Sequence, residues 1–370
     1  MNALAIFAAA ALTASALGQT EEPYAVGPVG PVGPLVIAGD GIADGDPAIW
    51  TAVLSRSLSG RPVCVLAMAG AQPPRASRRA LDSFETFGGR GTAVVLPVRA
   101  GSARLADRLQ ECGGFWFTGG DPSHIVDTLR PGGVDSAAAR AIRRAHDRGA
   151  VIGGTSAGAA MMSDPMIGDD HSGDALVHGT VSSEDLPGVW VRPGMGFLLG
   201  AITDPQHSAH GRFSRLLVAV AGTPSVRSGY WIDENTALIV EAAGISVVGS
   251  GAVVALELDR ASTPGDIRGT LWMIAAGDRL DPRTGEVTLD PRKTVLTAAG
   301  SAPAAPPDAW TGDLWCRWLE GLARSTDPIA RVPAGPGELE IAKQPGFRAV
   351  APSPSAALSA GPFRFAWPRE

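Results

Sequence analysis

Short apolar runs alternate with stretches of helical period through the first half of the chain. The apolar runs are nearly continuous, which is typical of strands that are buried on both faces of a sheet. These runs are Pro34–Ala38, Val63–Met68, Ala93–Val98, Gly114–Thr118 and Ala150–Gly153. The stretches of helical period are Ser77–Phe87, Ala103–Cys112 and Asp135–Arg148. Strand and helix in turn predict an α/β fold, a doubly wound and mostly parallel sheet.

The sequence VIGGTSAGAAMM at Val151–Met162 changes from a strand pattern to an alanine-rich helical pattern at Ser156. Small neighbours let a serine take the cramped turn that lifts its hydroxyl clear of a sheet, and Gly154 and Gly158 have no Cβ to collide there. The N-terminus of the following helix would also stabilise negative charge beside that hydroxyl. Ser156 is therefore the candidate nucleophile, although an ordinary glycine-rich turn explains the short motif equally well.

A second glycine-rich loop, FTGGDPSH at Phe117–His124, follows another predicted strand. Because loops at the carboxyl ends of parallel strands converge, the backbone N–H groups of both loops could meet there. Two such donors form an oxyanion hole for a tetrahedral intermediate, and we assign them to Gly120 and Ala157. The alternative for this loop is a turn in which Asp121 caps the next helix.

A polar turn follows the apolar strand that ends at Thr203. A neutral imidazole in this turn can accept the serine proton, so His207 is the candidate base. Arg212 and Arg215 lie three residues apart, share one helix face and could bind a substrate carboxylate. The other polar residues of the turn are Asp204, Gln206 and His210.

A candidate acid lies in SGYWIDENTALIV at Ser228–Val240, where Asp233 and Glu234 separate two predicted strands. A carboxylate there can orient the imidazole and stabilise its charged form, whereas the alternative is a hairpin turn with exposed charges. The polar segment Asp164–Arg192 fits no familiar metal-ligand spacing and is predicted to be a solvated loop. We expect no metal and no cofactor.

The charge composition of the chain limits the kinds of partner that it is expected to bind. The chain of 370 residues has 31 Lys and Arg against 37 Asp and Glu, which gives no broad attraction for nucleic acid or an anionic membrane. Residues 1–18 are apolar and end in small residues, which predicts a secretory signal and export, with a buried helix as the alternative. No later stretch has about eighteen uninterrupted apolar residues, so we expect no membrane span.

The remaining segments divide the chain into a domain and two appendages. Residues 19–33 are a Pro/Gly linker, and 34–294 are the predicted catalytic domain. Residues 295–370 are rich in Ala and Pro, with one amphipathic helix at Ala309–Arg324 and an otherwise extended or partly disordered path. Three cysteines allow at most one disulfide, and Cys64, inside an apolar run, is expected to be a buried thiol.

Several motifs in fixed order resemble the cyanophycinase-type serine peptidases, relatives of the aspartyl dipeptidases. The motifs are FTGGD, GGTSAGAA, D-x-x-H with R-x-x-R-L-L, IDENTAL and VVGSGAV, over Pro34–Pro291. The resemblance implies a flavodoxin-like α/β sandwich, similar to class I glutamine amidotransferases, that cleaves beta- or alpha-linked aspartyl peptides from an end without a metal. Carried over, Ser156 is the nucleophile, His207 the base and Glu234 the acid, with Asp170 and Asp174 open as alternative acids.

Two departures from the family pattern affect the substrate. Pro122 follows Asp121 where the family has glutamine, and only an inserted Pro205 returns His207 to the catalytic place. The substrate-binding candidates are Asp121, Asp204, Gln206, Arg212 and Arg215, and polycationic cyanophycin is a doubtful substrate. Alternatives are a binding protein with a remodelled histidine turn and, less favoured because the elbow carries serine, a glutamine-amidotransferase-like module. The expected partner is a peptide substrate, and a homodimer is left open.

Overall fold

The structure is a computed structural model. It describes residues 33–70, 72–88, 93–95, 103–168, 175–205, 213–263, 265–305, 314–334, 337–353 and 356–368. The predicted signal peptide and all of the linker except Gly33 lie outside the described residues. Among the described helices, none is both long enough and apolar enough to cross a membrane.

A nine-stranded sheet forms the centre of the N-terminal part, in the order β18-β17-β14-β13-β1-β5-β4-β2-β3. The segment from β1 to β3 is parallel, and β13 joins β1 antiparallel. Its strands are β1 Leu35–Ala38, β2 Val63–Leu66, β3 Ala93–Val95, β4 Gly114–Phe117, β5 Val151–Thr155, β13 Thr236–Glu241, β14 Gly244–Gly249, β17 Arg279–Leu280 and β18 Val287–Thr288. All five strands predicted in the first half of the chain are confirmed.

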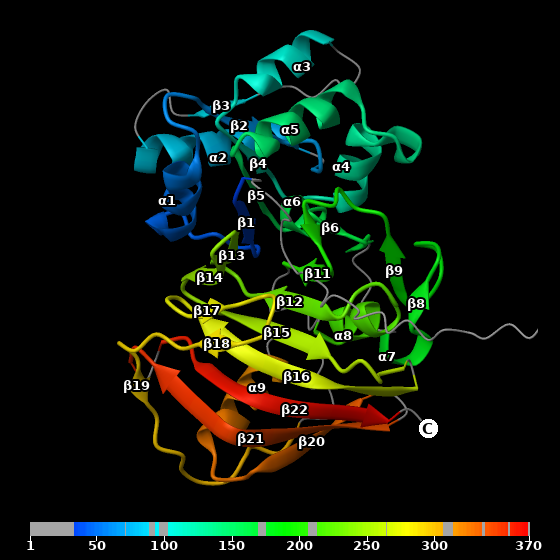
Figure 1. The fold of residues 1–370 in the computed structure, drawn as a ribbon, viewed down its shortest axis with the longest axis vertical. Helices are drawn as coiled ribbons and strands as arrows, with labels where there is room; N and C mark the ends of the chain where they lie inside the picture. The colour runs from blue at the N-terminus through cyan, green and yellow to red at the C-terminus, as the bar shows by residue number, and fades with distance from the viewer. Residues whose placement is uncertain are drawn as a thin grey trace, which may run out of the picture.

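Helices cover both faces of the parallel segment, because side chains of each strand alternate between two cores (Figure 1). Val36 and Ala38 pack against α1 Pro47–Arg56 and α2 Pro73–Gly88. Leu35 and Ile37 share the other core with α3, α4 and α5. These three helices are Ala103–Gln110, Pro122–Leu129 and Ala137–Asp147. The doubly wound, flavodoxin-like α/β fold is confirmed.

A second, eight-stranded sheet has the order β11-β12-β15-β16-β22-β21-β19, with β20 paired to β21. Tyr230 and Ile232 face the first sheet, whereas the neighbouring Trp231 faces the core formed with α8 Phe213–Ala221 and α9 Leu314–Arg324. The strands are β11 Ala201–Asp204, β12 Ser228–Ile232, β15 Ala252–Leu258, β16 Asp266–Ala275, β19 Thr294–Val295, β20 Ile329–Ala334, β21 Gly337–Ala351 and β22 Ser359–Pro368.

Short elements fill the space between Ser156 and β11. They are α6 Ala157–Ala160, β6 Ser163–Asp164, β7 Met166–Ile167, α7 Ala175–His178, β8 Thr180–Val181, β9 Val189–Arg192 and β10 Leu198–Leu199, and a short 3₁₀ turn, η1 Pro131–Gly133, follows α4. The prediction of a solvated loop over Asp164–Arg192 is therefore wrong for the described part, which contains four paired or helical segments. These segments pack beside α8 and β11.

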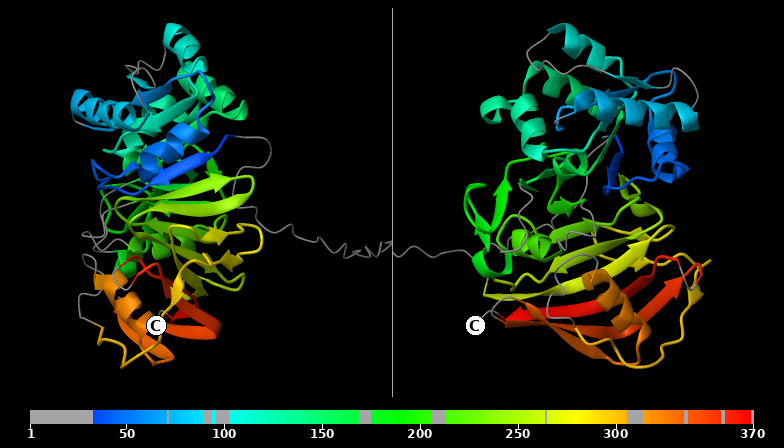
Figure 2. Two further views of the ribbon diagram at one scale, coloured as in Figure 1. Left: turned by 90° about the vertical axis from the view of Figure 1, so that its left-hand side faces the viewer. Right: turned by 180° about the vertical axis from the view of Figure 1, so that it is seen from behind.

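The C-terminal extension is an ordered continuation of the second sheet, so the prediction of an extended or partly disordered path is wrong for its described residues (Figure 2). β22 pairs antiparallel with β16 from Asp266 to Met273, and β21 pairs with β22. The predicted amphipathic helix is confirmed as α9, which buries Trp315, Trp318, Leu319 and Leu322.

A buried polar cluster attaches β22 to the loop that follows β16. The Lys293 ammonium lies 2.8 Å from Asp278 Oδ1 and donates to Ser359 Oγ, also at 2.8 Å. Ser359 Oγ in turn donates to Asp278 Oδ2 at 2.5 Å. All three side chains are buried. Their charges and hydrogen-bonding groups are therefore satisfied by one another rather than by water.

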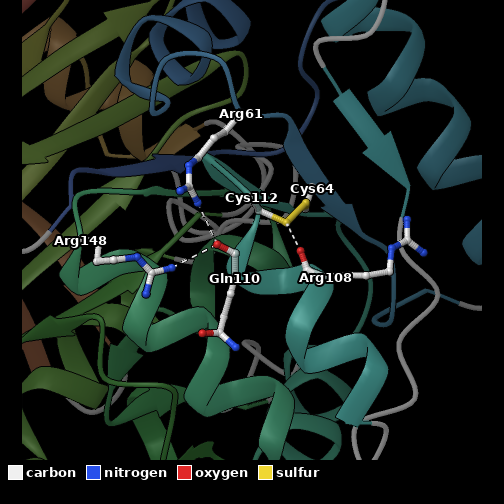
Figure 3. Close-up of a disulfide and its surroundings, with 6 residues drawn as sticks. All are labelled: Arg61, Cys64, Arg108, Gln110, Cys112 and Arg148. Atoms are coloured by element: carbon white, nitrogen blue, oxygen red, sulfur yellow. Dashed lines mark hydrogen bonds between the residues drawn. A yellow bond between two sulfur atoms is a disulfide. The ribbon is translucent and has the colours of Figure 1, made fainter.

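Cys64 of β2 and Cys112 after α3 form a disulfide, so the prediction of a buried thiol at Cys64 is wrong (Figure 3). Their Cα atoms lie 5.8 Å apart because α3 packs back across the sheet, 48 residues later in the chain. Arg61 and Arg148 both donate to the carbonyl of Gln110, next to this bond. The third cysteine, Cys316, lies on α9 and is not part of the disulfide.

Candidate functional site

Ser156 occupies a sharp turn between β5 and α6. Its φ of 53° and ψ of −122° lie in a region that L residues rarely adopt. Among the described residues, Asn235 is the other non-glycine residue with a positive φ. The backbone N–H of Ser156 donates to Ala38 O of β1 at 3.2 Å, and the residue is 8% exposed. Strain of this kind persists where the surroundings impose it, and it clusters at functional sites.

The glycines around Ser156 permit a close approach of three backbone segments. A Cβ on Gly154 would lie 2.4 Å from the carbonyl oxygen of Gly158, and a Cβ on Gly158 would lie 2.2 Å from that of Phe117. Real Cβ atoms do not approach oxygen so closely, so both positions require glycine. The GGTSAG sequence is therefore needed to hold the elbow against β4.

Substituting Ser156 by glycine is expected to stabilise the fold relative to the Ser156→Ala variant. Release of the backbone strain, about 1–3 kcal/mol, exceeds the entropic cost of glycine, about 0.5–1 kcal/mol. The free energy of unfolding, measured in urea, should rise by about 1 kcal/mol. At Ser163 of β6, where no positive φ is present, glycine should be less stable than alanine. If glycine and alanine variants rank in the same order of stability at both positions, backbone strain at the elbow is contradicted.

The β4–α4 loop lies directly against the serine. A Cβ on Gly119 would be 3.1 Å from Ser156 Cβ and 3.6 Å from its Oγ. The structure thus brings together the two glycine-rich loops that the sequence proposes. Within the described residues, the backbone N–H groups of Gly120 and Ala157 make no hydrogen bond. Both predicted oxyanion donors are therefore unused, and their catalytic role stays a prediction.

Asp121 caps helix α4, as the alternative interpretation of its loop predicts. One carboxylate oxygen accepts from Ser123 N at 2.7 Å, and the other lies 3.6 Å from His124 Nε2. The cap fixes the end of the Gly119–Gly120 loop at the N-terminus of α4. Contact between Asp121 and substrate stays a prediction.

Glu234 lies at the same edge of the first sheet as Ser156. The turn that carries it crosses from β12 in one sheet to β13 in the other, so it is not a hairpin. A Cβ on Gly41 would lie 2.9 Å from Glu234 Oε2, which places the carboxylate beside the loop after β1. Thr155, next to the serine, donates to Gly39 O of that loop at 2.6 Å. In the sheet, one strand, β1, therefore lies between β13, which follows Glu234, and β5, which precedes Ser156.

The C-terminal extension reaches this turn through α9. Burial raises the pKa of Glu320 on α9, and the negative charge of Asp233 raises it further, against the lowering effect of Arg324. Asp233 also accepts from the backbone N–H of Glu234 at 2.8 Å. The extension therefore contributes to the electrostatic surroundings of the candidate acid.

Asp204 and Arg215 bind each other in a buried ion pair. Arg215 Nε donates to Asp204 Oδ2 at 2.7 Å, and Arg215 Nη2 donates to Oδ1 at 2.6 Å. Both side chains are at most 2% exposed. The pair joins the end of β11 to the first turn of α8. Their predicted contact with substrate stays a prediction.

The predicted base lies outside the described residues. So do the binding candidates Gln206 and Arg212 and the alternative acids Asp170 and Asp174. The assignments of His207 and of these residues therefore stay predictions. In the part of the chain that the structure describes, no three His, Cys, Asp or Glu residues group closely enough to hold a metal ion.

Sequence reasoning missed a cavity of about 230 Å³ beside the elbow. Its wall includes Thr155, the residue before Ser156, and Gly119, which lies against the serine side chain, together with Trp50, Trp116 and Thr118. Trp50 and Trp116 have the pattern of ordinary core residues in α1 and β4, so no signal in the sequence distinguishes them. A larger groove of about 960 Å³ runs outside the cavity along α2.

Part of this chain is similar in sequence to a known family of peptidases. Residues 75–248 match the model of Peptidase family S51. The cyanophycinase of Trichormus variabilis is 28% identical over 53% of this chain, and that of Synechococcus elongatus is 27% identical over 52%. The aligned segment spans 63% and 58% of these relatives, less than two thirds of their length.

A solved structure supports the fold. The crystal structure of a peptidase from an acI-B1 Actinobacterium has a TM-score of 0.50 and 19% identity to this chain. The match covers 68% of this chain and 97% of that protein, so about a third of this chain has no counterpart in it. At this level of identity the likeness bears on the fold alone.

Proposed function

We propose that the chain is a serine peptidase of family S51 whose nucleophile is Ser156, because residues 75–248 match the model of that family and cyanophycinases are similar to part of the chain. The observation that carries the proposal is the positive φ of Ser156 at the end of β5, with the Gly119 loop against its side chain. A buried turn with this strain has no packing role that a glycine would not fill at lower cost. The hydroxyl is what the serine adds.

The proposed reaction proceeds through an acyl-enzyme. Ser156 Oγ attacks the scissile carbonyl while its proton passes to the imidazole of His207. The N–H groups of Gly120 and Ala157 bind the resulting oxyanion, and the imidazolium returns the proton to the leaving amine as the C–N bond breaks. Water, which gives a proton to the same imidazole, then attacks the acyl carbonyl; the ester bond to Ser156 Oγ breaks, the imidazolium returns the proton to Oγ, and the acid is released. Glu234 orients the imidazole and stabilises its charge.

The proposed substrates are short aspartyl peptides, including beta-linked ones, cleaved from an end. Support comes from the cyanophycinase relatives, and Pro122 in place of the family's glutamine argues against cyanophycin itself. Incubation of the purified protein with cyanophycin, an isoaspartyl dipeptide and an alpha-aspartyl dipeptide, with an assay for released amine, tests this choice. Release from cyanophycin alone would contradict it.

We also propose that the protein is exported. The apolar N-terminal residues provide the first support. The disulfide between Cys64 and Cys112 provides the second, because such bonds persist in oxidising compartments. Detection of the mature protein outside the cytoplasm, with an N-terminus near residue 19, tests the proposal.

A fluorophosphonate probe tests the nucleophile directly. The probe phosphonylates an activated serine and needs no substrate recognition, so the folded protein should be labelled at Ser156, as located by peptide mass spectrometry. Heat-denatured protein is the control and should not react. A folded but unlabelled protein would favour the second candidate, a binding protein whose histidine turn was remodelled by Pro205.

A further inference from the structure

We propose that Asn235 is a positioning residue for the reaction, which acts by fixing the carboxylate of its neighbour Glu234. The inference rests on the proposed peptidase function and adds to it the residue that holds the candidate acid in place. Asn235 lies in the turn between β12 and β13, and its φ of 47° is in the left-handed region. Asparagine tolerates this region better than most residues, but glycine adopts it without steric cost. The amide group is therefore what asparagine adds at this position.

Asn235 binds the loop of residues 39–46 between β1 and α1 at three points. Its Oδ1 accepts from the backbone N–H of Ala43 at 3.0 Å, and its Nδ2 donates to Asp46 Oδ2 at 2.7 Å. Its own backbone N–H donates to Asp40 O, also at 3.0 Å. The loop is therefore attached to the β12–β13 turn near its beginning, in its middle and at its end.

The same residue also binds the turn between β14 and β15. Asn235 Nδ2 donates to Ser250 Oγ at 3.0 Å, and the backbone N–H of Ser250 donates to Asn235 O at the same distance. Gly249 approaches that carbonyl so closely that a Cβ on it would lie 2.2 Å from the oxygen. The amide oxygen and the amide nitrogen of Asn235 are thus both used, and this one residue connects three segments of the chain.

The loop that Asn235 holds is the one against which the Glu234 carboxylate lies. A Cβ on Gly41 of that loop would be 2.9 Å from Glu234 Oε2 and 3.2 Å from Glu234 Cγ. The Glu234 main chain is fixed as well, because its N–H donates to Asp233 Oδ1 and its carbonyl oxygen accepts from Thr236 Oγ1, each at 2.8 Å. The surroundings of the carboxylate therefore depend on the separation of turn and loop, which the Asn235 amide sets.

The nucleophile is attached to the beginning of the same loop. Thr155 Oγ1 donates to Gly39 O at 2.6 Å, and the backbone N–H of Ser156 donates to Ala38 O at 3.2 Å. Residues 38–46 thus carry contacts to the elbow at one end and to Asn235 along the rest. Because a displacement of about 1 Å in a catalytic group can cost about 10²-fold in rate, these contacts bear on the reaction.

The first test measures how fast a fluorophosphonate probe labels Ser156, which needs an activated serine but no known substrate. Asn235→Gly keeps the left-handed backbone and removes the amide. Its maximal labelling rate should fall about tenfold, whereas the probe concentration that gives half of this rate should stay within about twofold. In a Glu234→Gln background the same substitution should change the rate less than about twofold, because the carboxylate that Asn235 positions is already gone. A merely structural role would lower the rate by the same factor in both backgrounds.

A second test exchanges the donor and the acceptor of one hydrogen bond. Asn235→Asp places a carboxylate against that of Asp46, so the labelling rate should fall about tenfold. Adding Asp46→Asn should return the rate to within about threefold of the wild-type value, because the amide at position 46 can donate to the carboxylate at position 235. The oxygen of that amide can still accept from the backbone N–H of Ala48, as Asp46 Oδ1 does at the start of α1.

The control is Ser262→Ala, which removes a hydroxyl that bonds both the N–H and the C=O of Arg268, beyond the opposite end of β15. It should leave the labelling rate unchanged. Thermal unfolding checks every variant, and the exchange of residues 46 and 235 decides the matter should Asn235→Gly not fold.

Three results would overturn the positioning role of Asn235. They are unchanged labelling of Asn235→Gly, an equal loss in both backgrounds, and a double exchange variant that is no faster than Asn235→Asp alone. The wild-type protein is labelled in each of these cases, so the peptidase proposal would stand. A folded wild-type protein that is not labelled would instead overturn both proposals.

Discussion

Peptide hydrolysis by the Ser156→Ala variant is expected to be slower than that of the wild-type protein by about 10⁴-fold or more, as for other enzymes that lose a catalytic serine. The variant loses the atom that forms the acyl bond, whereas the oxyanion donors and the substrate contacts remain. Both kcat and kcat/KM should fall together, measured on whichever aspartyl dipeptide the wild-type protein cleaves. The backbone of the elbow should stay unchanged because alanine keeps the same Cβ.

Ser163→Ala is the matched control for this substitution. Ser163 lies seven residues later, is fully buried and donates through Oγ to Ala160 O. Its substitution should leave the rate within about twofold, since a surviving fold keeps the catalytic geometry. Retention of activity in a folded Ser156→Ala protein would show that a different group acts as the nucleophile.

Arg215→Met is expected to lower the free energy of unfolding by about 3–5 kcal/mol, because it leaves the Asp204 carboxylate buried without its ion-pair partner. The double variant Asp204→Leu, Arg215→Met should recover most of this loss, since an apolar pair needs no desolvation of charge. Urea unfolding of the three proteins measures both effects. Arg331→Met, which removes an exposed ion pair with Glu340, should change stability far less.

The same double variant separates two roles of the pair. If Asp204 and Arg215 only join β11 to α8, a stable double variant should keep the KM of the wild-type protein. If they also bind substrate, KM should rise sharply although the protein is folded. Failure of the double variant to regain stability would contradict the expectation that an apolar pair can replace the buried ion pair.

The parallel part of the fold could be predicted because its signals are local. Strands such as β2 and β4 are buried on both faces, so their apolar residues run without interruption. The elbow was predictable for the same reason, since the need for glycine at Gly154 and Gly158 arises within a few residues. The candidate acid Glu234 was placed by the strands on either side of it.

The unpredicted features depend on contacts between distant residues. The disulfide joins residues 48 positions apart, and the Asp204–Arg215 pair forms only when α8 folds back on β11. The sequence of the C-terminal extension contains an alternating apolar pattern typical of strands, but its Pro and Ala content obscured this pattern. Phe363, Phe365 and Trp367 alternate along β22, and all three are buried, which is the period of a strand with one face in the core.

The cavity beside Ser156 could not be predicted from the sequence. Trp50 and Thr118 are ordinary members of α1 and the β4 loop, and nothing in their neighbours reveals that their polar atoms are unpaired. The cavity itself forms only where residues of α1, α2 and the β4–α4 loop meet.

The pairing of β22 with β16 has a consequence for handling the protein. A shortened chain that ends near residue 294 would lose both Ser359 and the strand that covers Asp266–Met273. The bare backbone of β16 would then be a template on which further copies could add strands, the usual route to aggregation of open sheets. Recombinant production of a chain that ends near residue 294 is therefore expected to yield aggregated material.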